Sequence, residues 1–271
     1  MIRYFLTCYF TLLLLVSSTF AQQKDSSLYQ LTFSLPTEAA YFNIDQLQQI
    51  YTISPTNQLK RYASDGTFQF EYNNNTLGNL TRVSVSNPFS LLLFYGDFRT
   101  LITLDRNLTE KNIFDLYQLD VNEIKAVAQS SDNNVWLYDD VQFKLKKINR
   151  QGRILIESND LSLTLGRALF PTYIIEKDNR VYVNDPAVGI LVFDILGQYL
   201  KTLDVRGLER FQIYNQQLIY AQQGKLHSFH LQSLLATTIQ LPRPLSEEAQ
   251  LFIQEGKLFW LEKGELKVYQ Y

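Results

Sequence analysis

The chain repeats one pattern of hydrophobic and polar positions six times. In each copy, aliphatic and aromatic residues alternate along a short run that ends at a polar position, as in Val181-Tyr182-Val183-Asn184-Asp185. Such a run is typical of a β-strand. The copies occupy residues 50–54, 93–97, 135–139, 181–185, 218–222 and 258–262. Their last positions are about 42 residues apart on average, which matches the period of a four-stranded propeller blade.

Each copy lies between two further strand signals. An apolar segment precedes it, at residues 42–44, 83–85, 124–127, 173–175, 211–213 and 251–253. Another follows it, at residues 59–62, 101–104, 143–148, 190–193, 226–229 and 266–269. Several of the connections contain Gly, Asn or Asp, as in Ser64-Asp65-Gly66, and these residues tolerate the positive φ that tight hairpins require. Every repeat therefore contains three consecutive antiparallel strands.

A fourth strand is predicted in five of the six repeats, at residues 68–72, 113–116, 154–156, 200–203 and 237–241. The sixth repeat ends at Tyr271 without one, while residues 28–33 form an unassigned strand near the N-terminus. Pairing these two ends removes the open strand edges that invite aggregation. We therefore predict an all-β, six-bladed β-propeller with four-stranded blades, whose last blade is closed by the N-terminal strand. A β-sandwich does not require six such copies, and the coil of a β-solenoid is shorter.

The repeat resembles that of six-bladed propellers of the NHL and YWTD type. Residues 181–185, followed by Phe193-Asp194 and the turn residue Gly197, form the best-matching copy. The resemblance covers residues 25–271 and implies an architecture, with little indication of chemistry. Ser54 and Gln222 stand where this type of blade carries an Asp.

The first 21 residues have the order of a secretory signal peptide. Arg3 precedes an apolar run at residues 4–16, and Thr19 and Ala21 occupy the small-residue cleavage positions. We predict cleavage after Ala21, a propeller domain at residues 22–271, and export to the periplasm, the outer envelope or the medium. The run is short for a membrane span of about 20 residues, so no stable span is expected after cleavage; an uncleaved anchor is the alternative. The sole cysteine, Cys8, would leave with the leader, which excludes disulfides and thiolate sites.

Composition and charge restrict the partners. The 271 residues include 25 Lys and Arg against 27 Asp and Glu, a formal net charge of −2, and no cationic run. Nucleic acid is therefore not an expected partner, because its backbone requires a basic surface. Plentiful Tyr (17) and Phe (18) agree with a strand-rich chain.

Polar residues after the second strand of several repeats form the candidate site. In a propeller, the loops between second and third strands and the links between blades gather at one mouth of the central channel. We predict ligand binding at this rim, including Arg167 in the polar link 158–167, which we expect to be extended. The alternative is that each acid caps its own loop, and that Arg167 pairs with Asp160. The candidates are Asp97, Arg99, Asp139, Asp140, Asp185, Glu262 and Arg167.

No catalytic motif is present, and no cofactor is predicted; Ca²⁺ held by carboxylates from several blades is the alternative. His227 and His230 are three apart on a predicted strand, so their side chains point to opposite faces and do not share one metal ion. We predict a monomeric, non-enzymatic protein that binds a protein or glycan partner in the cell envelope. The alternatives are a metal-dependent lyase or hydrolase with its site at the channel, and a structural docking platform in an envelope assembly.

Overall fold

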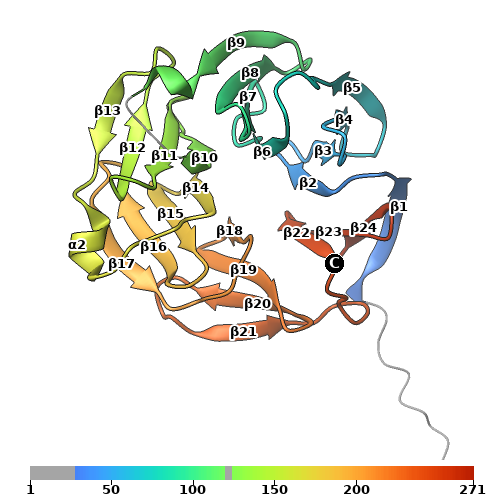
Figure 1. Ribbon diagram of the computed structural model, residues 1–271. Helices are drawn as coiled ribbons and strands as arrows, with labels where there is room; N and C mark the ends of the chain where they lie inside the picture. Colours follow the sequence, from blue (N-terminus) through green and yellow to red (C-terminus); the bar gives the residue numbers. More distant parts are fainter. Residues whose placement is uncertain (1–27, 120–123) are drawn as a thin grey trace, which may run out of the picture.

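Twenty-four strands form six separate antiparallel sheets of four strands each, arranged in a ring (Figure 1). This is the arrangement in the computed structural model, which describes residues 28–119 and 124–271. The six-bladed propeller predicted from the repeat is confirmed. The predicted leader at residues 1–21 lies outside the described residues.

Each sheet takes consecutive strands, except the last. Blade 1 contains β2 (Tyr41–Ile44), β3 (Ile50–Ile53), β4 (Leu59–Tyr62) and β5 (Phe68–Tyr72), and blade 2 contains β6 (Leu80–Ser84), β7 (Ser90–Tyr95), β8 (Thr100–Asp105) and β9 (Glu110–Asp115). Blade 3 contains β10 (Ile124–Gln129), β11 (Val135–Asp139), β12 (Lys144–Ile148) and β13 (Ile154–Glu157), and blade 4 contains β14 (Tyr173–Lys177), β15 (Arg180–Asp185), β16 (Gly189–Asp194) and β17 (Tyr199–Leu203). Blade 5 contains β18 (Gln212–Tyr214), β19 (Gln217–Gln222), β20 (Lys225–His230) and β21 (Ala236–Ile239). Blade 6 contains β22 (Gln250–Gln254), β23 (Lys257–Glu262), β24 (Glu265–Gln270) and β1 (Gln30–Pro36).

The N-terminal strand closes the ring as predicted. Strand β1 runs antiparallel to β24, with Leu35 opposite Leu266 and Gln30 opposite Gln270. It begins two residues later and ends three residues later than the predicted segment 28–33. Strand β1 is the outermost strand of blade 6 and pairs with β24 (Figure 1). The edge of β24 is therefore not left open.

The core lies between neighbouring blades. Side chains on the second strands pack against the next sheet: Trp136 of β11 is fully buried in a cluster with Ile174 and Val181 of blade 4. Trp260 of β23 is likewise fully buried, together with Ile219 of blade 5. Burying one large apolar side chain contributes about 1.5–3 kcal/mol, so these contacts hold the sheets face to face. The repeated aromatic positions therefore serve packing.

Amide side chains tie the inner strands of adjacent blades to one another. Asn43 Nδ2 of blade 1 donates to the Val83 carbonyl of blade 2 over 3.0 Å. Gln250 and Gln254 of blade 6 donate to the carbonyls of Ala40 and Asp45 of blade 1 over 2.6 and 2.8 Å. These bonds satisfy backbone carbonyls on strand edges that face the channel.

The link between blades 3 and 4 differs from expectation, because its centre is helical. Helix α2 (Leu161–Leu165) begins after Asp160, whose carboxylate accepts hydrogen bonds from the backbone N–H groups of Ser162 and Leu163, and it ends at Gly166 with φ +67°. The expectation of an extended link was wrong at these residues, because Asp160 supplies an N-cap and Gly166 a left-handed C-cap. In the part of the chain that the structure describes, no helix is long and apolar enough to cross a membrane.

Candidate functional site

Four of the predicted rim carboxylates follow or end a second strand, as the repeat indicated. Asp139, Asp185 and Glu262 are the last residues of β11, β15 and β23, and Asp97 lies two residues after β7. Asp140, beside Asp139, and Arg99 belong to the same kind of loop, whereas Arg167 follows α2. The six sheets share one strand order, so the second-to-third-strand loops and the links between blades lie on one side of the ring.

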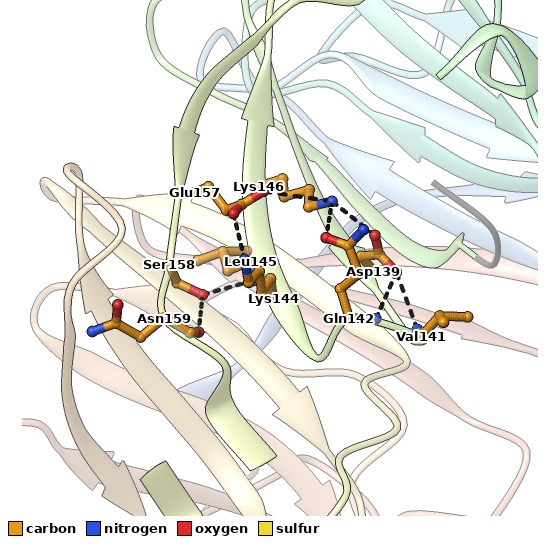
Figure 2. A network of polar contacts seen from close by, with 9 residues as sticks. All are labelled: Asp139, Val141, Gln142, Lys144, Leu145, Lys146, Glu157, Ser158 and Asn159. Atoms are coloured by element: carbon orange, nitrogen blue, oxygen red, sulfur yellow. Dashed lines mark hydrogen bonds and ion pairs between the residues drawn. The ribbon is translucent and has the colours of Figure 1, made fainter. Parts of the chain in front are cut away.

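Asp139 is fully buried and engaged within its own hairpin (Figure 2). Its Oδ1 accepts hydrogen bonds from the backbone N–H groups of Val141 and Gln142, each over 3.0 Å. Its Oδ2 lies 2.8 Å from Nζ of Lys146, which is also buried and donates to Gln142 Oε1. Two hairpin N–H groups and one buried ammonium thus share this carboxylate.

Glu157 approaches the same lysine from the fourth strand of the blade. Its carboxylate lies 3.6 Å from Lys146 Nζ and accepts a hydrogen bond from Lys144, which lowers the pKa of Glu157 (Figure 2). Nearby, the hydroxyl of Ser158 accepts from the backbone N–H of Leu145 over 3.0 Å. This network joins β11, β12 and the end of β13.

Asp140 and Asp185 are also buried. Asp140 lies 3.6 Å from Lys125 Nζ. Asp185 accepts from the N–H groups of Ala187 (2.8 Å) and Val188 (3.2 Å) in its own turn, and from Phe170 (2.8 Å) in the link that enters the blade. Asp185 therefore anchors the incoming chain.

The charges of Asp140, Asp185 and Asp139 all act on one side chain, the buried Tyr138. Burial raises the pKa of the Tyr138 hydroxyl, and the charges of Asp140 and Asp185 add to the effect. This cluster lies at the boundary between blades 3 and 4. Within residues 28–119 and 124–271, no three His, Cys, Asp or Glu side chains form a set suited to holding a metal ion. Ca²⁺ binding at the rim stays the alternative to a site without a cofactor.

The remaining rim residues lie in other blades. Asp97 is exposed, and its Oδ2 accepts from the Asn79 N–H over 2.9 Å. Glu262 accepts a hydrogen bond from the Ser246 hydroxyl and lies 2.6 Å from Nη2 of Arg243, and both contacts lower its pKa.

The two rim arginines have different surroundings. The Arg99 guanidinium lies 4.7 Å from the centre of the Tyr117 ring. Arg167 is exposed, and Asp160, the partner considered as the alternative to a ligand, caps α2. The rim residues thus fall into several separate groups, and their role in ligand binding stays a prediction.

A cavity of about 1100 Å³ opens among blades 1, 4, 5 and 6. Its wall contains inner-strand residues such as Tyr41 and Tyr173, together with link residues that precede β18 and β22. Among the described residues that line it, none belongs to the seven rim candidates. Arg210 and three exposed glutamates are its charged lining residues: Glu209, Glu247 and Glu248.

Two arginines in this region were not predicted from the sequence. The Arg210 guanidinium lies 4.2 Å from the centre of the Tyr41 ring. The Arg82 guanidinium lies 4.3 Å from the centre of the Tyr173 ring and donates to the Thr172 carbonyl over 3.0 Å. The available signal was a charged residue, Arg82, within the first strand of blade 2.

Burial shifts the pKa values of Arg82 and Tyr41. It lowers the pKa of Arg82 to about 10, and the charge of Arg210 acts in the same direction. Burial raises the pKa of Tyr41 to about 12, against the effect of the two arginine charges. At neutral pH Arg82 is therefore cationic and Tyr41 is neutral.

No protein-family model and no curated protein matches this sequence. Solved structures do resemble it in fold. A catalytically inactive virginiamycin B lyase from Staphylococcus aureus with quinupristin has a TM-score of 0.64 and 10% identity, covering 90% of this chain and 99% of that one. The Neurospora crassa Pan2 WD40 domain has a TM-score of 0.60 and 9% identity over 89% and 95% of the two chains. BamB from Moraxella catarrhalis has a TM-score of 0.54 and 11% identity over 90% and 98%.

These identities establish the propeller fold alone. The likenesses do not single out the NHL or YWTD type, which stays a prediction from the repeat. What the chain binds must be argued from its own surface.

Proposed function

We propose that this protein is an exported, non-enzymatic β-propeller that binds a protein or glycan partner in the cell envelope through the mouth of its central channel. The observation that carries the proposal is the cavity of about 1100 Å³, which four blades line together. Ligand sites are concave, largely preformed and built where several elements converge. A ring of rigid sheets that presents link residues around a cavity meets that description.

The proposed site is the cavity and its link residues, with the rim carboxylates in a supporting role. Asp139 and Asp185 accept hydrogen bonds from backbone N–H groups of their own loops, so their oxygens are already engaged. Glu247 and Glu248, by contrast, are exposed on the cavity wall. Support for export comes from the order of charged, apolar and small residues at positions 1–21.

A lyase or hydrolase at the channel is the alternative from a different class. The fold likeness includes lyases, but at 10% identity it supports the fold only. General acid–base chemistry uses His most often. The chain has two histidines, both described: His227 stacks on Tyr220, and His230 Nδ1 accepts from the Ser233 N–H over 3.1 Å. Neither is among the residues that line the cavity.

Site-specific photo-crosslinking in the exporting cell tests the proposal. A photoreactive amino acid at Glu247, on the cavity wall, should give a discrete crosslinked species, whereas the same group at Gln151, an exposed turn residue between third and fourth strands, should not. Binding of the purified protein to a glycan array tests for a carbohydrate partner. Crosslinking from Gln151 alone, without glycan binding, would contradict a partner at the mouth and support a docking platform that uses the opposite face.

A further inference from the structure

Arg82 and Arg210 reach across the central channel from different sides. Arg82 lies on β6 of blade 2 and contacts Thr172 and Tyr173 in blade 4, passing blade 3. Arg210 precedes β18 of blade 5 and lies over Tyr41 in blade 1, passing blade 6. Figure 1 shows β6 and β14, and likewise β18 and β2, on separate sides of the central opening. The two side chains therefore bring two cations into the same channel.

No carboxylate of the described residues forms an ion pair with either guanidinium. The two tyrosine rings on which they lie, Tyr173 and Tyr41, line the same cavity, and the charge of Arg210 opposes protonation of Arg82. Like charges held together in a partly buried site raise the free energy of the folded state. A negative group between them relieves that repulsion.

The arginines also present oriented donors. Each planar guanidinium lies on a tyrosine ring, 4.3 Å away for Arg82 and 4.2 Å for Arg210, which restricts its rotation and leaves its N–H edge available. A guanidinium carries five N–H donors, of which Arg82 uses one for Thr172. The fork of donors matches the two oxygens of a carboxylate, phosphate or sulfate.

We infer that the channel binds the oxyanion group of a small ligand, a carboxylate, phosphate or sulfate, between Arg82 and Arg210. This inference rests on the proposed function and names the chemistry recognised at that site. The exposed glutamates of the cavity wall, Glu209, Glu247 and Glu248, refine the specificity. Their charges repel an extended polyanion at the mouth but are screened beyond about 8 Å at physiological salt, so a ligand with one compact anionic group is favoured.

Binding of defined anions to the full chain, expressed with its leader and purified, tests the inference. The probes are sodium phosphate, sodium sulfate, sodium acetate and sodium galacturonate, each compared with sodium chloride at equal ionic strength. We expect at least one probe to raise the melting temperature by about 2 °C or more at 50 mM and to bind in calorimetry. The probe that binds best distinguishes a phosphate or sulfate from a carboxylate. Heparin should not compete.

Arg210→Gln is the main variant for this test. Arg210 is exposed, so replacing its side chain leaves no unfilled position in the core. We expect the dissociation constant to rise at least tenfold in Arg210→Gln and in Arg82→Gln, since each loses charge-assisted hydrogen bonds. Arg150→Gln, at an exposed turn outside the channel, is the matched control and should bind as the unaltered protein does. An equal loss in the control, undiminished binding in Arg210→Gln, or no response to any of the four probes would overturn the inference.

The results of the anion-binding experiment and of the crosslinking experiment can be distinguished from each other. If crosslinks form at Glu247 but no anion binds, the oxyanion site is wrong and the partner site at the mouth stands. If anions bind in an Arg210-dependent manner but crosslinks form only at Gln151, the channel binds a small anion and the proposed partner surface is wrong.

Discussion

The turn carboxylates are buried and the channel arginines are partly buried (Arg82) or exposed (Arg210), and the charges of the two groups are balanced in different ways. Asp139 and Asp185 each accept at least two backbone hydrogen bonds within their own turn, and Asp139 also pairs with a buried lysine. Arg82 and Arg210 have only aromatic rings and one carbonyl as neighbours in the described contacts. A charge that is satisfied locally stabilises its loop, whereas one without a counter-charge is available for a ligand. The comparison predicts that substitutions in the two regions affect stability very differently.

Asp139→Asn should lower the free energy of unfolding more than any of the following substitutions. It leaves the ammonium of Lys146, which is 1% exposed, without its nearest counter-charge. Removing one partner of a buried ion pair costs about 3–5 kcal/mol, so we expect a loss near the lower end of that range because Glu157 lies 3.6 Å from the same nitrogen. Urea unfolding measures the loss. The double variant Asp139→Asn with Lys146→Met should recover most of it, and a loss below about 1 kcal/mol in the single variant would contradict the assignment.

Asp185→Ala should have the second largest effect, a loss of about 2–3 kcal/mol in the free energy of unfolding. The substitution removes the acceptor for the backbone N–H groups of Phe170 and Ala187 in a buried environment, and one of the two acceptors for Val188, whose N–H also donates to the Asp185 carbonyl. Asp194→Ala is the matched control, because Asp194 accepts from two turn N–H groups that are exposed and that water can satisfy. Equal losses in the two variants, measured by chemical denaturation, would show that burial of the turn does not matter.

The architecture was predictable because the repeat is local. The segments predicted as 59–62 and 68–72 coincide with β4 and β5, and the pairing of β1 with β24 followed from counting strands. The turn positions of Asp139 and Asp185 were also predictable, since each ends a second strand. The contacts of Arg82 with Thr172 and of Arg210 with Tyr41 were not, because each depends on how far a side chain reaches across the ring. Such contacts join residues 90 positions or more apart and leave no local pattern.

Asp132→Asn should lower stability by about 1 kcal/mol or less at pH 7, since the carboxylate is about half exposed. Burial alone would raise the pKa of Asp132, but hydrogen bonds from Lys147 and Asn134 outweigh it and lower the pKa to about 2. A carboxylate whose folded pKa is lowered stabilises the fold above its unfolded pKa near 3.8, and this contribution is lost as the pH falls towards 2. The difference between the variant and the unaltered protein should therefore shrink between pH 4 and 2 in urea titrations. A difference that is constant across this range would contradict an ionic contribution.

Arg210→Gln should have the smallest effect on stability, within about 0.5 kcal/mol of the unaltered protein and in either direction. The exposed guanidinium loses its contact with the Tyr41 ring, but the repulsion of Arg82 disappears with it. Because repulsion between the two cations is weakened by salt, the unaltered protein should gain stability as sodium chloride rises from 10 to 200 mM, and Arg210→Gln should gain less. Thermal unfolding across this salt series measures both quantities. If the variant were destabilised as strongly as Asp185→Ala, Arg210 would be a structural residue like the turn carboxylates, and the distinction between the two regions would fail.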